Sequence, residues 1–184
     1  MSDDMFEDVL RAAKAGDENA FAQIWRALNP PVERYLRTLA PSSAGDLASE
    51  TWLQVIRNLS SFSGGEPAFR AWVFTIARNK VIDAARHDKR RPLTTSDNSA
   101  IDACASPDDT ALLAMERLST DSALALIATL PSDQAEVIML RVVAGLDAAT
   151  VATIVGKSPG AVRVAAHRGL RRLQELVGRP PVTL

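Results

Sequence analysis

The sequence contains one cysteine, Cys104, and two histidines, His87 and His167, which lie far apart in the chain. A single cysteine excludes an internal disulfide and any metal site built from a cysteine cluster. Two histidines so far apart in the chain are unlike the clustered ligands of a metal site or the paired groups of a catalytic site. The sequence also shows no nucleophile with a neighbouring base and no phosphate-binding loop. We therefore expect no bound metal or other cofactor and no enzymatic activity.

Long hydrophobic runs are also missing. No apolar stretch approaches the roughly 20 residues that span a bilayer, so we expect no membrane insertion. The first ten residues are acidic where a secretion signal would be basic, which predicts a cytoplasmic protein. The chain is nevertheless 184 residues long and 47% hydrophobic, enough to bury a substantial core.

The whole chain has little net charge, −1, but its charges are unevenly distributed. Residues 70–91 carry seven basic and two acidic side chains, and residues 156–179 carry six and one, so each segment has a net charge of +5. Residues 92–136 carry one basic and eight acidic side chains, a net charge of −7. Two basic segments separated by an acidic one predict two contact points on one polyanion, with the acidic part kept away from it.

Apolar residues recur at spacings of three and four, which predicts an all-α fold with no convincing strand. We expect helices up to residue 91 and again from 110, with a break at Pro30-Pro31 and a long helix beginning at Pro67. Residues 92–109 are rich in Ser, Thr, Asp and Pro and show no period. The chain is therefore expected to form two small helical domains, 1–91 and 110–184, joined by a flexible acidic linker.

The last two expected helices are separated by a turn at Gly156, which predicts a helix-turn-helix, with Asp147 and Ser158 as amino-terminal caps. A helical wheel puts one apolar face of the final helix inward: Val162, Ala166, Leu170, Leu173 and Val177. The opposite half is basic and predicts a helix that enters the major groove of DNA. Its candidate contacts to bases and phosphates are Lys157, Ser158, Arg163, Val164, His167, Arg168, Arg171 and Arg172.

The long helix of residues 67–91 combines aromatic and basic side chains. Phe69, Trp72 and Phe74 stand near its start, and its cations include Arg70, Lys80 and others up to Arg91. Composition alone leaves two alternatives open: a core helix with a basic tail, or a surface that stacks and holds single-stranded nucleic acid.

DNA binding does not account for the residues in segment 46–59. Asp46 and Glu50 are one helical turn apart, so they share a face that would repel DNA but could pair with the basic residues of a protein. No partner for acid–base catalysis is evident, and a protein interface is the better interpretation.

These three segments together resemble the extracytoplasmic-function group of the sigma-70 family of transcription initiation factors. The stretches that carry the resemblance are GDLASETWLQVIRNL, FSGGEPAFRAWVFTIARN and the segment from LPSDQAEV to HRGLRRL. They occur in the family's order and cover nearly the whole chain apart from the linker. The resemblance implies an alternative sigma factor that binds core RNA polymerase through its beta and beta-prime subunits, reads promoter DNA and is held by an anti-sigma factor.

The resemblance also implies roles for particular residues. Residues 1–91 would bind polymerase and melt the −10 element, whereas 110–184 would read the −35 element. Polymerase would be bound by Asp46, Leu47, Glu50 and Leu53, and the loop of residues 63–69 would hold a flipped base. The −10 contacts would be Phe69, Arg70, Trp72, Asn79, Lys80, Asp83 and Arg86.

The sequence departs from the family pattern at three places: Ser49 replaces a glutamine, residues 148–151 are less polar, and Val164-Ala165 replaces a Ser-Arg pair. The last departure predicts an unusual −35 preference. Two alternatives to a sigma factor stay open at this point: a stand-alone helix-turn-helix regulator, which would bind duplex DNA without polymerase, and a helical adaptor whose basic faces meet acidic proteins.

Overall fold

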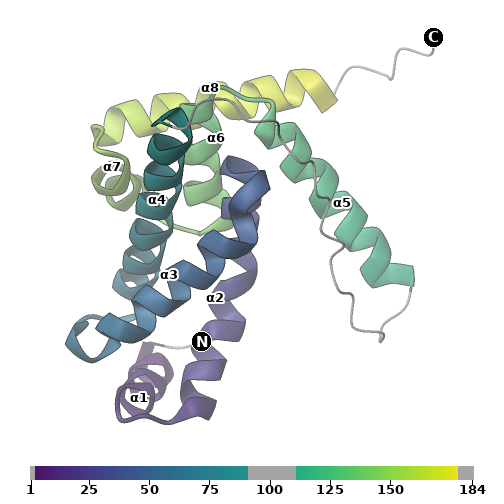
Figure 1. Ribbon diagram of the computed structural model, residues 1–184. Helices are drawn as coiled ribbons and strands as arrows, with labels where there is room; N and C mark the ends of the chain where they lie inside the picture. Colours follow the sequence, from purple (N-terminus) through teal and green to yellow (C-terminus); the bar gives the residue numbers. More distant parts are fainter. Residues whose placement is uncertain (1–2, 91–110, 178–184) are drawn as a thin grey trace.

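The computed structural model describes residues 3–90 and 111–177, and every regular element in these ranges is helical (Figure 1). This confirms the predicted fold class; the predicted linker, residues 92–109, lies outside the described ranges. The helices are α1 (Asp3–Lys14), α2 (Glu18–Leu39), α3 (Ala44–Asn58), α4 (Glu66–Arg90), α5 (Ala111–Ala128), α6 (Ser132–Ile138), α7 (Ala148–Val155) and α8 (Pro159–Val177). Two short 3-10 helices, η1 (Pro41–Ser43) and η2 (Leu59–Ser61), and a π-helical turn, η3 (Met139–Val143), complete the set. None of the described helices has the length and apolar character needed to cross a membrane.

Helices α1 to α4 form an amino-terminal half around an aromatic and aliphatic core. Phe6 of α1 packs on Phe69 of α4, with ring centroids 5.5 Å apart, and Tyr35 of α2 meets Phe74 edge to face. All four rings are almost completely buried. Burying side chains of this kind supplies about 1.5–3 kcal/mol each, so these contacts hold α1, α2 and α4 together.

Helix α2 runs unbroken through Pro30 and Pro31, so the predicted break there is wrong. Proline removes a helical hydrogen bond and crowds the preceding turn, which usually ends a helix. Here Leu28 and Val32 on either side are buried in the core. The buried Asn29 side chain also accepts a 2.8 Å hydrogen bond from the indole Nε1 of Trp52 on α3. Tertiary contacts on both sides of the prolines therefore hold the chain helical.

Helices α6 to α8 and the turn η3 form the carboxy-terminal half, and local signals set the helix ends. Gly145 and Gly156 adopt positive φ angles of 68° and 67°, where glycine is favoured. Asp147 caps α7 by accepting hydrogen bonds from the amides of Ala149 and Thr150. These hydrogen bonds, led by that from Thr150, lower the pKa of the Asp147 carboxyl. The expected stops and caps of the helix-turn-helix are therefore present.

The inward face of α8 differs from the predicted one. Val162, Ala165 and Gly169 are buried, whereas Leu170 is 46% and Val177 is 70% exposed. The reason is close packing on α6: a Cβ added at Gly169 would lie 2.5 Å from the Cδ1 of Ile138. Small residues let the two helices approach, and this rotates α8 away from the face that apolar spacing alone predicts.

The two halves pack against each other. Helix α2 contacts α5, α6 and η3, and α4 contacts α7. In Figure 1, α8 lies across one end of α6, whereas α5 diverges from the remaining helices. The described surfaces of α3, α4 and α8 are consequently held in one arrangement.

Candidate polymerase and nucleic-acid interfaces

Helix α3 presents one exposed face that combines charge and apolar surface. Asp46, Glu50 and Arg57 lie on it at helical spacing and are all exposed. Leu53 and Ile56 are each 51% exposed on the same part of the helix. An apolar centre flanked by charges is the usual anatomy of a protein interface. Ile56 belongs to this surface although the family resemblance did not assign it to polymerase binding.

Leu47 does not share that exposure. Its side chain is buried in the core, as is that of Trp52 on the same helix. Of the four residues expected to bind polymerase, the structure therefore brings Asp46, Glu50 and Leu53 to the surface and places Leu47 behind them.

An ion pair links this face to α4: the Nζ of Lys80 lies 3.0 Å from a carboxylate oxygen of Glu50. The Glu50 side chain is about half exposed and that of Lys80 about a quarter. The sequence analysis assigned these two residues to different partners, protein and DNA. Their pairing shows that the two candidate surfaces adjoin.

Helix α4 carries an exposed polar row, Asn79, Asp83 and Arg86, spaced so that all three lie on one side of the helix. Arg86 lies 3.5 Å from Asp83, and both side chains are about 70% exposed. Exposed pairs of this kind contribute little to stability, so these groups are available to a partner at low cost.

The aromatic side chains at the start of α4 form a cluster. Phe62 stacks on Trp72 with centroids 5.0 Å apart, and Phe69 meets both rings edge to face. Phe62 and Trp72 are partly exposed, but Phe69 is fully buried. The face of Phe69 is therefore not open to a base, and its ring supports the other two from within.

Arg70 points toward the carboxy-terminal half. Its guanidinium donates to the carboxylate of Glu66 and, at 3.4 Å, to the backbone carbonyl of Ala144. Arg70 is thus on a different side of α4 from Asn79 and takes part in packing the two halves together.

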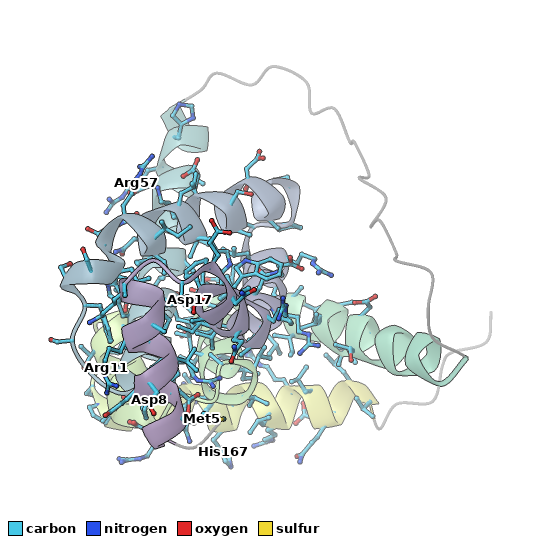
Figure 2. The ribbon with its side chains drawn as sticks, turned by 90° about the horizontal axis from the view of Figure 1, so that it is seen from below. Met5, Asp8, Arg11, Asp17, Arg57 and His167 are labelled. Atoms are coloured by element: carbon cyan, nitrogen blue, oxygen red, sulfur yellow. The ribbon has the colours of Figure 1, made fainter. Side chains whose placement is uncertain are left out.

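The first half of α8 presents Arg163, Val164, His167 and Arg168, all exposed. Val164 is 50% exposed, so an apolar side chain lies open within the basic row. The row follows the turn at Gly156, in the position from which the second helix of a helix-turn-helix reaches base edges. Figure 2 shows His167 on the opposite side of the view from Arg57 of α3.

The other expected contacts of this unit already have partners within the chain. The Oγ of Ser158 accepts from the amide of Ala161 and so caps α8. Arg172 donates to the buried Gln134 at 3.1 Å, and this bond braces α8 on α6. The remaining two are held by exposed ion pairs, Lys157 with Asp133 at 3.3 Å and Arg171 with Glu175 at 3.1 Å.

Glu136 of α6 joins the two halves, a role that the sequence analysis missed. Its Oε1 accepts from Arg78 of α4 at 2.7 Å and from the Tyr35 hydroxyl at 3.2 Å. Burial and then the Glu136 charge raise the pKa of Tyr35 well above its ordinary value. The one signal in the sequence was that Glu136 lies in LPSDQAEV, the start of a segment that carries the family resemblance.

The structure offers no centre for metal chemistry in residues 3–90 and 111–177: no group of three or more His, Cys, Asp or Glu side chains could hold an ion there. What it does bring to the surface is a mixed charged and apolar face on α3, a polar row on α4 and a basic row on α8.

Two models of known families match the chain, Sigma-70 region 2 over residues 24–91 and Sigma-70 region 4 over residues 120–173. The chain is 35% identical to the ECF RNA polymerase sigma factor SigD of Mycobacterium tuberculosis, over 95% of its own length and 85% of the relative's. It is 37% identical to the ECF RNA polymerase sigma factor ShbA of Streptomyces griseus, over 91% and 93% of the two chains.

Among solved structures, the chain resembles the sigma factor RpoE of Bartonella quintana, which was crystallised with the anti-sigma factor NepR. The TM-score is 0.63 at 24% identity, covering 85% of this chain and 96% of the other. At that identity the likeness establishes a shared fold.

Proposed function

The chain belongs to the extracytoplasmic-function group of the sigma-70 family and is an alternative sigma factor that directs RNA polymerase to promoters, and we propose how its surfaces divide that task. We assign residues 1–91 to polymerase binding, −10 recognition and melting, 92–109 to a linker, and 110–184 to −35 recognition. Family membership decides against the stand-alone regulator and the adaptor weighed from the sequence. We further propose that the protein acts in the cytoplasm without catalytic chemistry of its own.

We base the assignment of −35 recognition on the exposed basic row of α8. Arg163 and Val164 stand near the amino terminus of the helix, where base edges are reached, and Val164 offers an apolar contact to a thymine methyl. Arg171 lies two turns further on and is assigned to phosphate, as is Lys157. The exposed pairs that now hold these two cations are weak and exchange readily for phosphate.

The experiment compares Arg163→Ala with Arg171→Ala in the holoenzyme, on promoters that differ only in the −35 element. Loss of Arg163 should weaken binding to the preferred sequence by about 1–3 kcal/mol and to the others much less. Loss of Arg171 should weaken binding to every sequence alike and reduce the salt dependence by about one phosphate contact. Equal effects of Arg163→Ala on all promoters would remove it from base recognition.

Polymerase binding is assigned to the exposed face of α3, through Asp46, Glu50, Leu53 and Ile56. A carboxylate pair beside an apolar patch suits a basic and apolar partner, here the beta-prime subunit, with the beta subunit bound by the other half. An anti-sigma factor that covers these surfaces is the second protein partner we propose; the solved relative with NepR supports this as an analogy.

The −10 element is assigned to α4 and the loop before it. Asn79, Asp83 and Arg86 would face the element, and residues 63–69, the loop before α4 together with its first turn, would receive a base flipped out of the melted strand. The stacked rings of Phe62 and Trp72 would form the apolar side of that site. Extruding a base costs a few kcal/mol, so a preformed site can read it and stabilise the melted DNA together.

A further inference from the structure

Helix α1 lies outside the residues matched by the family models, yet it forms one side of a hollow with the loop that follows α3. The hollow is open to solvent and has a volume of about 380 Å³. Its walls come from two segments: Glu7, Leu10, Arg11 and Lys14 of α1, and Ser63, Gly64 and Gly65 of the loop.

Lys14 connects the two walls. Its Nζ donates a hydrogen bond to the backbone carbonyl of Phe62 and lies 5.9 Å from the centroid of the Phe62 ring. Lys14 is half-buried, and Leu10, one turn before it in the helix, and its neighbour Ala13 are in the core. The ammonium is therefore presented to the loop from a fixed helix.

The loop itself has little room to adjust. Gly64 has a φ of 138°, and a Cβ added there would lie 3.0 Å from the Cβ of Ala68 and 3.3 Å from the Phe62 ring. The Phe62 ring is in turn stacked on Trp72. Lys14 thus holds the residue from which both the glycine turn and the aromatic stack begin.

Arg11 supplies a second cation to the same hollow. Its guanidinium pairs with Asp8 at 2.8 Å, one turn away on α1, and both side chains are more than 70% exposed. Figure 2 shows the two residues together on α1. Because exposed pairs are weak, Arg11 can exchange Asp8 for a phosphate at little cost. Glu7 is the one carboxylate that lines the hollow beside two cations.

We infer that α1 is part of the −10 site: Lys14 is a positioning residue that sets the loop of residues 62–65 for base capture, and Arg11 binds a phosphate of the same single strand. This inference rests on the proposed base-capturing function of that loop. The ligand class is a nucleotide unit of single-stranded DNA, recognised by a rigid glycine turn, an aromatic side and cations.

The test uses holoenzyme and fork probes that are duplex upstream and single-stranded across the −10 element, with each of the four bases placed at every single-stranded position. Wild-type protein first identifies the position at which bases are discriminated. Lys14→Met should then reduce that discrimination about three- to tenfold, the effect expected for one lost hydrogen bond. Lys14→Arg, which keeps a donor and a charge, should restore it.

Arg11→Gln should behave differently from Lys14→Met. It should weaken binding to all probes by one factor and lower the slope of log affinity against log salt by about 0.7. The matched control, Arg26→Met, removes an exposed cation from α2 and should alter neither the discrimination nor the slope.

Two results overturn the inference and are distinguishable. If wild-type protein discriminates bases and Lys14→Met discriminates equally well, α1 does not set the loop although the loop still reads a base. If wild-type protein discriminates at no single-stranded position, the proposed base capture fails and the inference with it.

Discussion

Among single side chains, Glu50 has two competing roles, because it pairs with Lys80 within the chain and lies on the face assigned to polymerase. The pair is half exposed on the carboxylate side, so it is weak and leaves Glu50 free to meet a basic partner. A variant at Glu50 therefore changes both interactions, and the two can be separated only with a variant at Lys80.

We predict that Glu50→Gln weakens binding of core polymerase and that Glu50→Lys weakens it further, by several kcal/mol, because like charges then meet at the interface. Lys80→Met, which removes only the internal pair, should leave polymerase affinity unchanged. The measurement is equilibrium binding of labelled protein to core polymerase. A loss with Lys80→Met as large as that with Glu50→Gln would mean that Glu50 acts only by holding Lys80.

A second prediction at the residue scale compares an exposed residue of α4, expected to contact DNA, with a buried residue that stabilises the helix. Asn79→Ala should reduce discrimination among −10 sequences and leave thermal stability within about 0.5 kcal/mol of wild type, because Asn79 is exposed. Phe69→Ala should destabilise the protein by about 3–5 kcal/mol, because the buried ring packs on Phe6, Phe62 and Trp72. Denaturant unfolding and promoter binding check the pair, and a stable Phe69→Ala protein would contradict the assignment.

At the scale of helices, local signals in the sequence predicted more than apolar spacing did. Gly145 and Gly156 act through their own backbone geometry, and Asp147 acts through its side chain on the amides of the next residues, so these helix ends were predictable from the sequence. The inward face of α8 was not, since it depends on how closely Gly169 approaches α6. The break expected at Pro30-Pro31 is absent for a similar reason: contacts with α3 and the core, which sequence spacing does not record, hold α2 together.

The crossing of α6 and α8 gives a prediction for Gly169. Gly169→Val should destabilise the protein by about 1–3 kcal/mol, because the new side chain meets the buried Ile138. The matched control is Gly160→Val near the start of the same helix, where an added Cβ would have only the Ser158 hydroxyl nearby, at 3.9 Å. Thermal unfolding checks both, and equal destabilisation by the two would contradict the close approach at Gly169.

At the scale of the whole molecule, the candidate surfaces could be predicted from the sequence, but the contacts that pack the two halves together could not. Nothing in the spacing around Glu136 shows that it meets Arg78 and Tyr35, residues 58 and 101 positions away. Arg70 makes another such contact, since it donates to the backbone carbonyl of Ala144, 74 positions away. Contacts between residues so distant in the chain are determined by how the two halves pack.

We predict that Glu136→Gln lowers the free energy of unfolding by about 1–3 kcal/mol, because it removes the charge from a partly buried hydrogen bond with Arg78. Glu175→Gln, which breaks the exposed pair with Arg171, should cost less than about 1 kcal/mol. X-ray scattering should show a larger radius of gyration for Glu136→Gln than for the control. Identical scattering and stability of the two variants would show that Glu136 does not hold the halves together.

The contact also predicts a pH dependence. The raised pKa of Tyr35 means that the folded protein holds the phenol proton more tightly than the unfolded chain does. The corresponding stability is fully present below the ordinary tyrosine value near 10 and is lost as the pH rises through the raised folded value. Tyr35 is the one tyrosine in the chain, so phenolate absorbance reports it directly. An ordinary titration in the folded protein would contradict its burial.

The central claim is that this sigma factor reads promoters through α8 and α4 once polymerase holds it. The most direct measurement is binding of free protein, core polymerase and reconstituted holoenzyme to one promoter and to versions altered separately in the −35 and −10 elements. The account predicts sequence-specific binding by holoenzyme alone, lost in part with each alteration. Specific binding by the free protein, undiminished without core polymerase, would contradict it.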